Sequence, residues 1–134
     1  MSSNIELIIS GIICGIILLQ TTVIAPSIFK YLDQNQTRDL LRSIFPKFFL
    51  VILLLGFTSL TIGFLNDSNL DIQLIISAFT VILSLLCYLI IPATNNSKDN
   101  NDDKKFKLLH KISVFSTMII LITNLFWIFF INDV

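Results

Sequence analysis

Four long runs of apolar residues constrain the fold of this chain more than any other feature of its sequence. They cover residues 5–25, 48–65, 72–91 and 112–131. Each is close to the about 20 helical residues that cross the hydrocarbon core of a bilayer. In lipid a helix satisfies its own backbone hydrogen bonds, whereas an open sheet cannot. We therefore predict an all-α fold, an integral membrane antiparallel four-helix bundle that forms a single domain over residues 1–134 and has the lipid bilayer as its partner.

The composition supports a membrane protein and argues against several other classes. Hydrophobic residues make up 54% of the chain and charged residues 13%, about half the charged share of an ordinary soluble domain. The formal net charge is zero, so we expect no nucleic-acid partner. Cys14 and Cys87 lie inside apolar runs, outside any metal-ligand spacing. We therefore predict no disulfide, metal site or cofactor.

The basic residues predict how the chain is oriented in the membrane. All nine fall between the first and second apolar runs or between the third and fourth. The positive-inside rule then places residues 26–47 and 92–111 in the cytoplasm and both termini outside, in a membrane that we take to be a bacterial inner membrane. The nine are Lys30, Arg38, Arg42, Lys47, Lys98, Lys104, Lys105, Lys107 and Lys111.

Three prolines are predicted to interrupt the helices. Proline lacks a backbone donor and restrains the residue before it. We expect Pro26 to kink or break the end of the first helix, Pro46 to do so at the entry of the second, and Pro92 to end the third. Residues 37–45 form an amphipathic segment that suits an interfacial helix or an inward extension of the second helix. Asp102 suits the start of the fourth helix, where the helix dipole favours anions.

Small residues form stripes on the predicted helices. Gly11 and Gly15 make a GxxxG pair, and Gly56 and Gly63 lie on one face of the second helix. Such stripes let helix backbones approach closely in lipid. We expect them to pack against neighbouring helices of the same chain, and a homo-oligomer is the alternative for the first pair. A further stripe in the third helix (Ser77, Thr80, Ser84 and Cys87) is predicted to face inward.

Polar residues are also predicted to meet near the cytoplasmic end of the bundle. His110, Ser113 and Thr117 are spaced by three and four residues, so they share a helix face. Gln20 reaches a similar depth on the antiparallel first helix. These residues either hydrogen-bond one another and the carbonyls freed by the prolines, or form a pocket for a ligand, a proton or an ion. Charged side chains are not expected deep in any span, so carboxylate-coupled ion transport is not favoured.

Four short stretches resemble a known family. They are APSIFKYL at 25–32, FPKFF at 45–49, IPATNN at 91–96 and FKLLHKIS at 106–113. In order and spacing they are similar to the transmembrane protein 205-like family of small four-helix membrane proteins, over most of the chain. Thr117 stands where members often have asparagine. The resemblance implies a pocket that also includes Asn95, and its recurring positions would be Pro26, Phe29, Phe45, Pro46, Pro92, Asn95, His110 and Ser113.

That family has no established biochemical activity, so function is predicted from the residues. The first hypothesis is a membrane protein that binds or passes a small solute or ion through the polar pocket at the cytoplasmic end. The alternative is a structural or assembly protein that binds partner helices through its small-residue faces. An enzyme with His110 as an acid–base group is the least favoured reading, so we predict that the protein is not an enzyme.

Overall fold

The computed structural model describes residues 2–65 and 71–130, and these form helices joined by short turns. Four helical stretches are long and apolar enough to cross a membrane: Asn4–Tyr31, Gln34–Leu65, Ile72–Asp99 and Asp103–Phe129. The prediction of an all-α membrane bundle is therefore confirmed. In order, the elements are α1 (Ser2–Leu19), the π-helix η1 (Gln20–Ile24), α2 (Ala25–Tyr31), α3 (Gln34–Leu65), α4 (Asp71–Asp99) and α5 (Asp103–Phe130).

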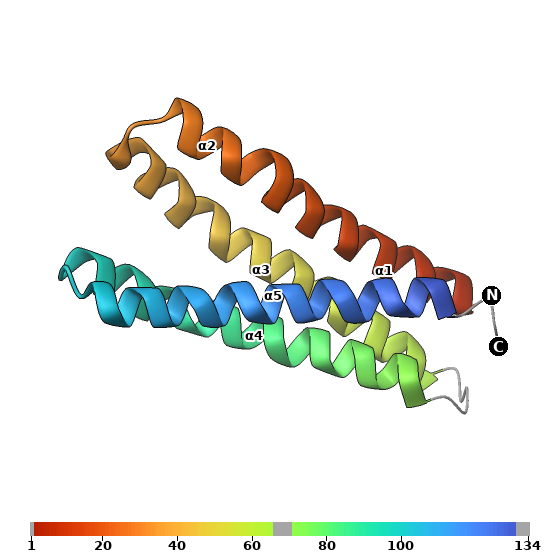
Figure 1. The fold of residues 1–134 in the computed structure, drawn as a ribbon. Helices are drawn as coiled ribbons and strands as arrows, with labels where there is room; N and C mark the ends of the chain where they lie inside the picture. The colour runs from red at the N-terminus through yellow and green to blue at the C-terminus, as the bar shows by residue number, and fades with distance from the viewer. Residues whose placement is uncertain (1, 66–70, 131–134) are drawn as a thin grey trace.

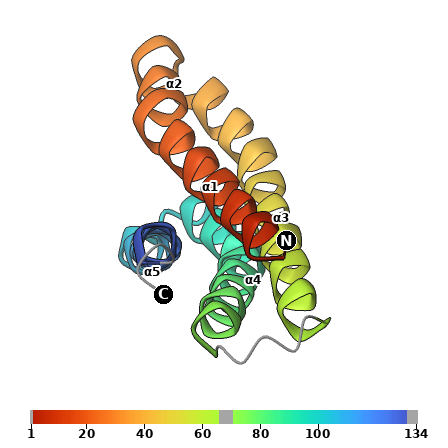
Figure 2. The same cartoon turned by 90° about the vertical axis from the view of Figure 1, so that its right-hand side faces the viewer.

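The helices alternate in direction along the bundle (Figure 1). α3 packs against α4, α4 against α5, and α1 against both α5 and α3. We call the end that holds the α2–α3 and α4–α5 connections the basic end, and the opposite end, where α1 begins and α5 ends, the terminal end. At the basic end α2 diverges from the α4–α5 turn, as both views show (Figures 1 and 2).

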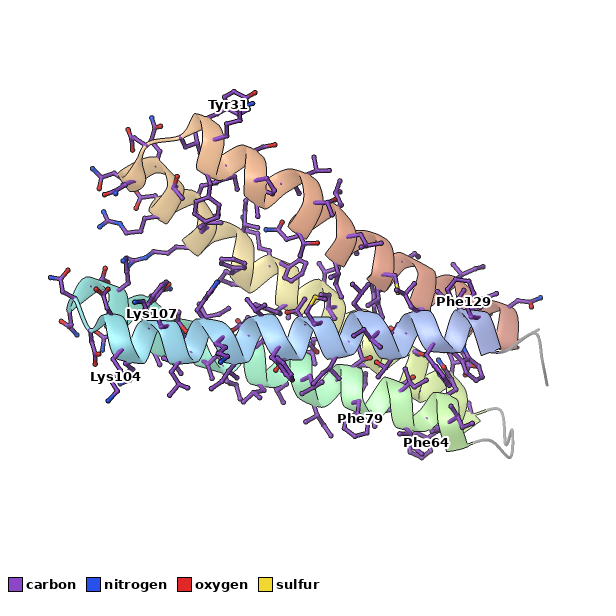
Figure 3. All side chains as sticks on the ribbon, in the orientation of Figure 1. Tyr31, Phe64, Phe79, Lys104, Lys107 and Phe129 are labelled. Atoms are coloured by element: carbon purple, nitrogen blue, oxygen red, sulfur yellow. The ribbon has the colours of Figure 1, made fainter. Side chains whose placement is uncertain are left out.

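The core of the bundle is an apolar layer near the middle of the helices. Ile13 and Ile17 of α1, Ile52 of α3 and Ile120 of α5 are fully buried there. Large hydrophobic side chains are also exposed on every long helix, and Phe79 points away from the bundle in Figure 3. An apolar surface of this extent suits lipid rather than water.

The first helix continues through Pro26 by changing its hydrogen-bonding pattern. The Ala25 N–H donates to the Gln20 carbonyl, five residues back, which defines the π-helix η1. A π-turn inserts one residue, and such bulges are a common way for a helix to absorb a proline. Thr22 Oγ1 adds a bond to the Leu18 carbonyl at 2.6 Å. Pro26 therefore makes the helix irregular but does not break it.

α3 begins at Gln34, about four turns before the apolar run that starts at residue 48. Asp33 caps it, since Asp33 Oδ1 accepts the Gln36 N–H at 2.8 Å and Gln36 Oε1 accepts the Asp33 N–H at 3.4 Å. This reciprocal pair is a capping box. The amphipathic segment therefore extends the second membrane helix, as one of the two predicted forms, and Pro46 lies inside α3.

The prediction that Pro92 ends the third helix is wrong. α4 runs on to Asp99 with Pro92 inside it. It ends in a Schellman motif, in which the Asp102 N–H donates to the Ser97 carbonyl at 2.9 Å and the Asn101 N–H to the Lys98 carbonyl at 3.2 Å. Asn101 adopts φ 55°, which asparagine tolerates better than most residues.

The next helix starts at once, as the acidic residues predicted. Asp102 Oδ1 accepts the Lys105 N–H at 3.0 Å and so caps α5. The predicted cytoplasmic segment 92–111 is thus almost entirely helical rather than a loop. Nearby, Arg42 of α3 pairs with Asp99 and donates to the Asn95 carbonyl at 3.4 Å, which ties α3 to α4 at the basic end.

The glycine stripes divide into a buried pair and an exposed pair. Gly56 and Gly63 are buried on α3, and a Cβ at Gly56 would lie 2.9 Å from Thr80 Cγ2 of α4. These close contacts are in keeping with the packing role predicted for the two glycines. Gly11 and Gly15 are exposed, and a Cβ at either would meet none of the described atoms within 4 Å. The expectation that they pack within the chain is therefore wrong, because α1 turns this face outward.

Candidate functional site

The residues predicted to form a pocket at the basic end do not form one hydrogen-bonded cluster. Thr117 Oγ1 donates to the Ser113 carbonyl at 2.8 Å, four residues back on the same helix. Gln20 is only 6% exposed, yet its Nε2 finds no acceptor among the described residues. Asn95 is half-buried and contributes its carbonyl to Arg42. The predicted bonds that join His110 to Ser113 and Gln20 are absent from the described part of the chain.

His110 lies on the surface of α5. Its ring stacks on Phe106 one turn earlier, with centroids 5.9 Å apart and planes 6° apart. Lys98 Nζ lies 5.1 Å from the centroid of the same Phe106 ring. α2 diverges from the α4–α5 turn at this end (Figures 1 and 2), and His110 is exposed. Further along α5, the helix face that His110 shares with Thr117 does turn into the bundle, because Thr117 and Asn124 are buried there.

Buried polar side chains gather instead in the other half of the bundle. We call them the terminal polar cluster, and every long helix contributes at least one member. The members are Glu6 of α1, Ser59 of α3, Gln73, Ser77 and Thr80 of α4, Asn124 of α5, and the half-buried Trp127 of α5, whose Nε1 atom is buried.

One part of the cluster joins α3 to α4. Gln73 Nε2 donates to Ser59 Oγ at 2.9 Å and lies 3.4 Å from Ser77 Oγ. Ser77 Oγ donates to Ser59 Oγ at 2.9 Å. Ser59 therefore accepts two hydrogen bonds. Gln73 Oε1 is buried and accepts none from the described residues, so the network ends in an acceptor without a donor.

A second part joins α4 to α5. Asn124 Nδ2 donates to Thr80 Oγ1 at 3.0 Å and to the Ile120 carbonyl at 2.9 Å. Thr80 Oγ1 in turn donates to the Ile76 carbonyl at 2.9 Å. Interhelical bonds of this kind hold helices together in lipid. They also fix the Thr80 rotamer, because its hydroxyl both donates and accepts.

Glu6 is an acidic side chain near the terminal end of the first span, not deep within it. It is only 6% exposed, and its Oε1 lies 3.5 Å from the position of a Cβ on Gly63. The absence of a side chain at Gly63 therefore leaves room for the carboxylate against α3. The described residues provide neither a hydrogen-bond donor nor a cation to the Glu6 side chain, and an ionisable group buried in a membrane bundle is a candidate functional residue.

Trp127 is the member of the terminal polar cluster that α5 contributes beyond Asn124. Its Nε1 is buried and has no acceptor among the described residues. The bond between Asn124 and Thr80 fixes the register of α5 on α4. At 1.5 Å per residue, Trp127 and Ser77 both lie about 4–5 Å beyond that bond toward the terminal end. The Trp127 Nε1 donor therefore lies at about the same depth in the membrane as Ser77, whose network ends in the Gln73 Oε1 acceptor.

The two cysteines play a packing role near the middle of the bundle. Both are buried and free. Cys14 Sγ lies 3.8 Å from the Leu121 carbonyl, and Cys87 Sγ lies 3.8 Å from the Ser113 carbonyl. In the described part of the chain, His, Cys, Asp and Glu side chains do not form a group of three or more that could hold a metal ion.

Comparison with protein-family models gives one match. The model described as Domain of unknown function (DUF4149) matches residues 8–103, which is more than half of the chain. The chain belongs to this family. The matched DUF4149 segment includes Ser59, Gln73, Ser77 and Thr80 but ends before Asn124 and Trp127 and begins after Glu6. A search of curated proteins and a search of solved structures found no match.

Proposed function

We propose that this DUF4149 protein binds a small, singly charged cationic solute at the terminal polar cluster, within the membrane. The observation that carries this proposal is Glu6, a mostly buried acidic residue whose carboxylate has neither a hydrogen-bond donor nor a cation among the described residues. Taking an ionised carboxylate partly out of water is costly, and a bound cation offsets that cost.

The other cluster members suit a cation that carries N–H groups. Gln73 Oε1 is a buried acceptor without a donor among the described residues, and so it can accept a hydrogen bond from such an N–H group. The Trp127 ring adds an aromatic face, the side chain best suited to contact with a cation. One carboxylate with neutral acceptors balances one positive charge, so an alkylammonium ion is the solute class that we propose.

Binding is favoured over passage by the apolar layer in the middle of the bundle. Ile13, Ile17, Ile52 and Ile120 are fully buried between the terminal polar cluster and the basic end. A charged solute would have to leave its polar partners to cross this layer. We therefore propose a binding protein rather than a channel. We likewise propose that it is not an enzyme, since His110 is exposed and stacked on Phe106.

Equilibrium dialysis with radiolabelled methylammonium tests this proposal. Wild-type protein in nanodiscs of neutral lipid should bind the label saturably, and Glu6→Gln should lose at least tenfold in affinity, because about 1.4 kcal/mol corresponds to each factor of ten. His110→Gln is the matched control at the other end and should bind as wild type does. Equal binding by wild type and Glu6→Gln would remove the carboxylate from the site.

A second candidate function is assembly with another membrane helix, and the exposed Gly11 and Gly15 favour it. The two glycines leave a flat strip on α1 that the chain itself does not cover. Close helix pairs in lipid commonly use such strips. Sedimentation in detergent would show it as a dimer that Gly15→Leu dissociates and that Thr58→Leu, at an exposed position of α3, leaves intact. A monomer at all protein concentrations would remove this candidate.

We also infer that the basic end faces the cytoplasm, because all nine basic residues lie in segments at that end. Cysteine placed at Asn100 should resist a membrane-impermeant thiol reagent in intact cells, and cysteine at Asn4 should react. Cys14 and Cys87 are buried and give little background. The reverse pattern would invert the orientation.

The closer resemblance to transmembrane protein 205-like proteins, and a bacterial inner membrane as the location, remain proposals. Of the motifs that suggest this resemblance, those around Pro26, Pro46 and Pro92 lie inside the matched residues 8–103, and the motif with His110 and Ser113 lies outside them.

A further inference from the structure

The start of α5 carries four lysines that form no ion pair with the described residues. Lys104, Lys105, Lys107 and Lys111 are all exposed. The ion pairs of the described chain join Arg38 to Asp39, Arg42 to Asp99 and Lys98 to Asp103, and so involve none of these four. Figure 3 shows Lys104 and Lys107 at the basic end of the bundle.

Each of the three acidic groups closest to these lysines in the sequence has a partner other than a lysine ammonium group of this set. Asp103 lies 3.8 Å from Lys98 Nζ, and Asp102 Oδ1 accepts the backbone N–H of Lys105 at 3.0 Å. Asp99 pairs with Arg42 of α3. None of these three carboxylates forms an ion pair with the four lysines, although Asp102 lines the same depression as Lys104 and Lys105. Three lysines there outnumber this one carboxylate when Lys111 is included.

Two shallow, open depressions lie on the surface of α5 near these lysines and share Leu108. We call the two together the lysine groove. The first is lined by Asp102, Lys104, Lys105 and Leu108, and the second by Leu108, Lys111, Ile112, Phe115 and Ser116. One face of α5 carries residues 104, 108, 111 and 115, which are spaced by four, three and four. Lysine charge therefore lies toward the start of this face, and the apolar Phe115 side chain lies further along it.

The apolar part of the groove is open to lipid. Leu108 is 60% exposed and Phe115 is 67% exposed. A span of about 20 residues that ends near the last described residue of α5 begins near Lys111. Lys111 then lies at the edge of the hydrocarbon, Lys104 and Lys105 lie one to two turns further out among the headgroups, and Phe115 lies among the acyl chains.

We propose that the lysine groove is a binding site for an anionic phospholipid. The phosphate lies against the ammonium groups of Lys104, Lys105 and Lys111, which bind phosphate as point charges. The acyl chain follows Leu108, Ile112 and Phe115 toward the middle of the bilayer. A soluble anion would use only the charged half of the groove. A zwitterionic lipid also presents a phosphate, but its own cationic group is repelled by the lysines, so the two halves together favour a lipid with net negative charge.

Native mass spectrometry of the protein in neutral micelles measures this selectivity, with dioleoyl phosphatidylglycerol and dioleoyl phosphatidylcholine as probes. A lysine near the surface contributes roughly fivefold to the binding of anionic lipid. The triple variant Lys104→Gln/Lys105→Gln/Lys111→Gln should therefore bind phosphatidylglycerol roughly 100-fold more weakly and phosphatidylcholine as wild type does.

The matched control removes the same charge from the same end but outside the groove. It is Lys30→Gln/Arg38→Gln/Lys47→Gln, whose residues are also exposed, and it should keep phosphatidylglycerol affinity within about fivefold of wild type, the contribution of one lysine. Equal losses in the two triple variants would mean diffuse attraction by the whole basic end, and the site would not exist.

Two further measurements separate a lipid from other anions. Glycerol phosphate, which has no acyl chain, should fail to displace phosphatidylglycerol at equal concentration, and Phe115→Ala should weaken the lipid without changing the response to glycerol phosphate. Displacement by glycerol phosphate, or a lipid affinity unchanged in Phe115→Ala, would overturn the lipid assignment. Circular dichroism and a single peak in gel filtration establish that each variant is folded.

Discussion

Gly56 of α3 is the position where one added methyl group is expected to disturb the bundle most. A Cβ there would lie 2.9 Å from Thr80 Cγ2 and 3.3 Å from Val81 Cγ2. Thr80 cannot turn away freely, because its hydroxyl donates to the Ile76 carbonyl and accepts from Asn124 Nδ2. The methyl group must therefore push α3 and α4 apart or break the bond to Asn124.

Comparison with Gly15 isolates this packing effect. Overpacking of a well-filled core costs about 1–3 kcal/mol, whereas a Cβ at Gly15 meets none of the described atoms within 4 Å. Both changes replace a mid-helix glycine by alanine, so the gain in helix propensity, about 0.5–1 kcal/mol, largely cancels between them. Gly56→Ala should therefore be about 1–3 kcal/mol less stable than Gly15→Ala.

Unfolding in mixed micelles with increasing dodecyl sulfate, followed by circular dichroism, gives the free energy of each variant. Gly63→Ala is a useful intermediate, because its closest contact is Leu74 Cδ2, at 2.8 Å, the end of a flexible side chain that can move. It should lose less than Gly56→Ala. Equal free energies for Gly56→Ala and Gly15→Ala would refute the close approach of α3 and α4 on which the fold is built.

Three further substitutions test individual contacts by the same unfolding assay. Asn124→Leu removes the bond to Thr80 and should cost about 0.5–2 kcal/mol, with Ile122→Leu, a nearby exposed position, as the neutral control. Arg42→Ala should cost at most about 1 kcal/mol, a loss that vanishes in high salt, since both side chains of its pair with Asp99 are partly exposed. Asn101→Val should cost about 1–2 kcal/mol because a β-branched residue resists φ 55°, whereas Asn101→Gly should cost little.

The long apolar runs predict the helices well because membrane helices depend on length and hydrophobicity, which are local properties. Helix ends depend on more. Pro92 fails to stop α4, since a membrane bundle tolerates a proline inside a helix, and the helix ends at the Schellman motif around Asn101 instead. Asp33 and Asp102 are caps that the local sequence does indicate.

The candidate site is harder to predict because it depends on how each helix is rotated about its axis. The spacing of His110, Ser113 and Thr117 identifies a shared face, but His110 is exposed at the basic end, where α2 diverges from the α4–α5 turn. Glu6 stands second in its apolar run, and its burial depends on Gly63, more than fifty positions away. An acidic residue inside an apolar run was the signal available in the sequence.

The most direct test of the terminal polar cluster uses Trp127, the single tryptophan of the chain. Its indole ring lies at the depth of the serine network, so a solute bound there should alter its emission. Titration of nanodisc-embedded protein with methylammonium should give a saturable change in Trp127 fluorescence in wild type and His110→Gln, and none in Glu6→Gln. A response that is identical in wild type and Glu6→Gln, or absent in wild type, would contradict a cation site at Glu6.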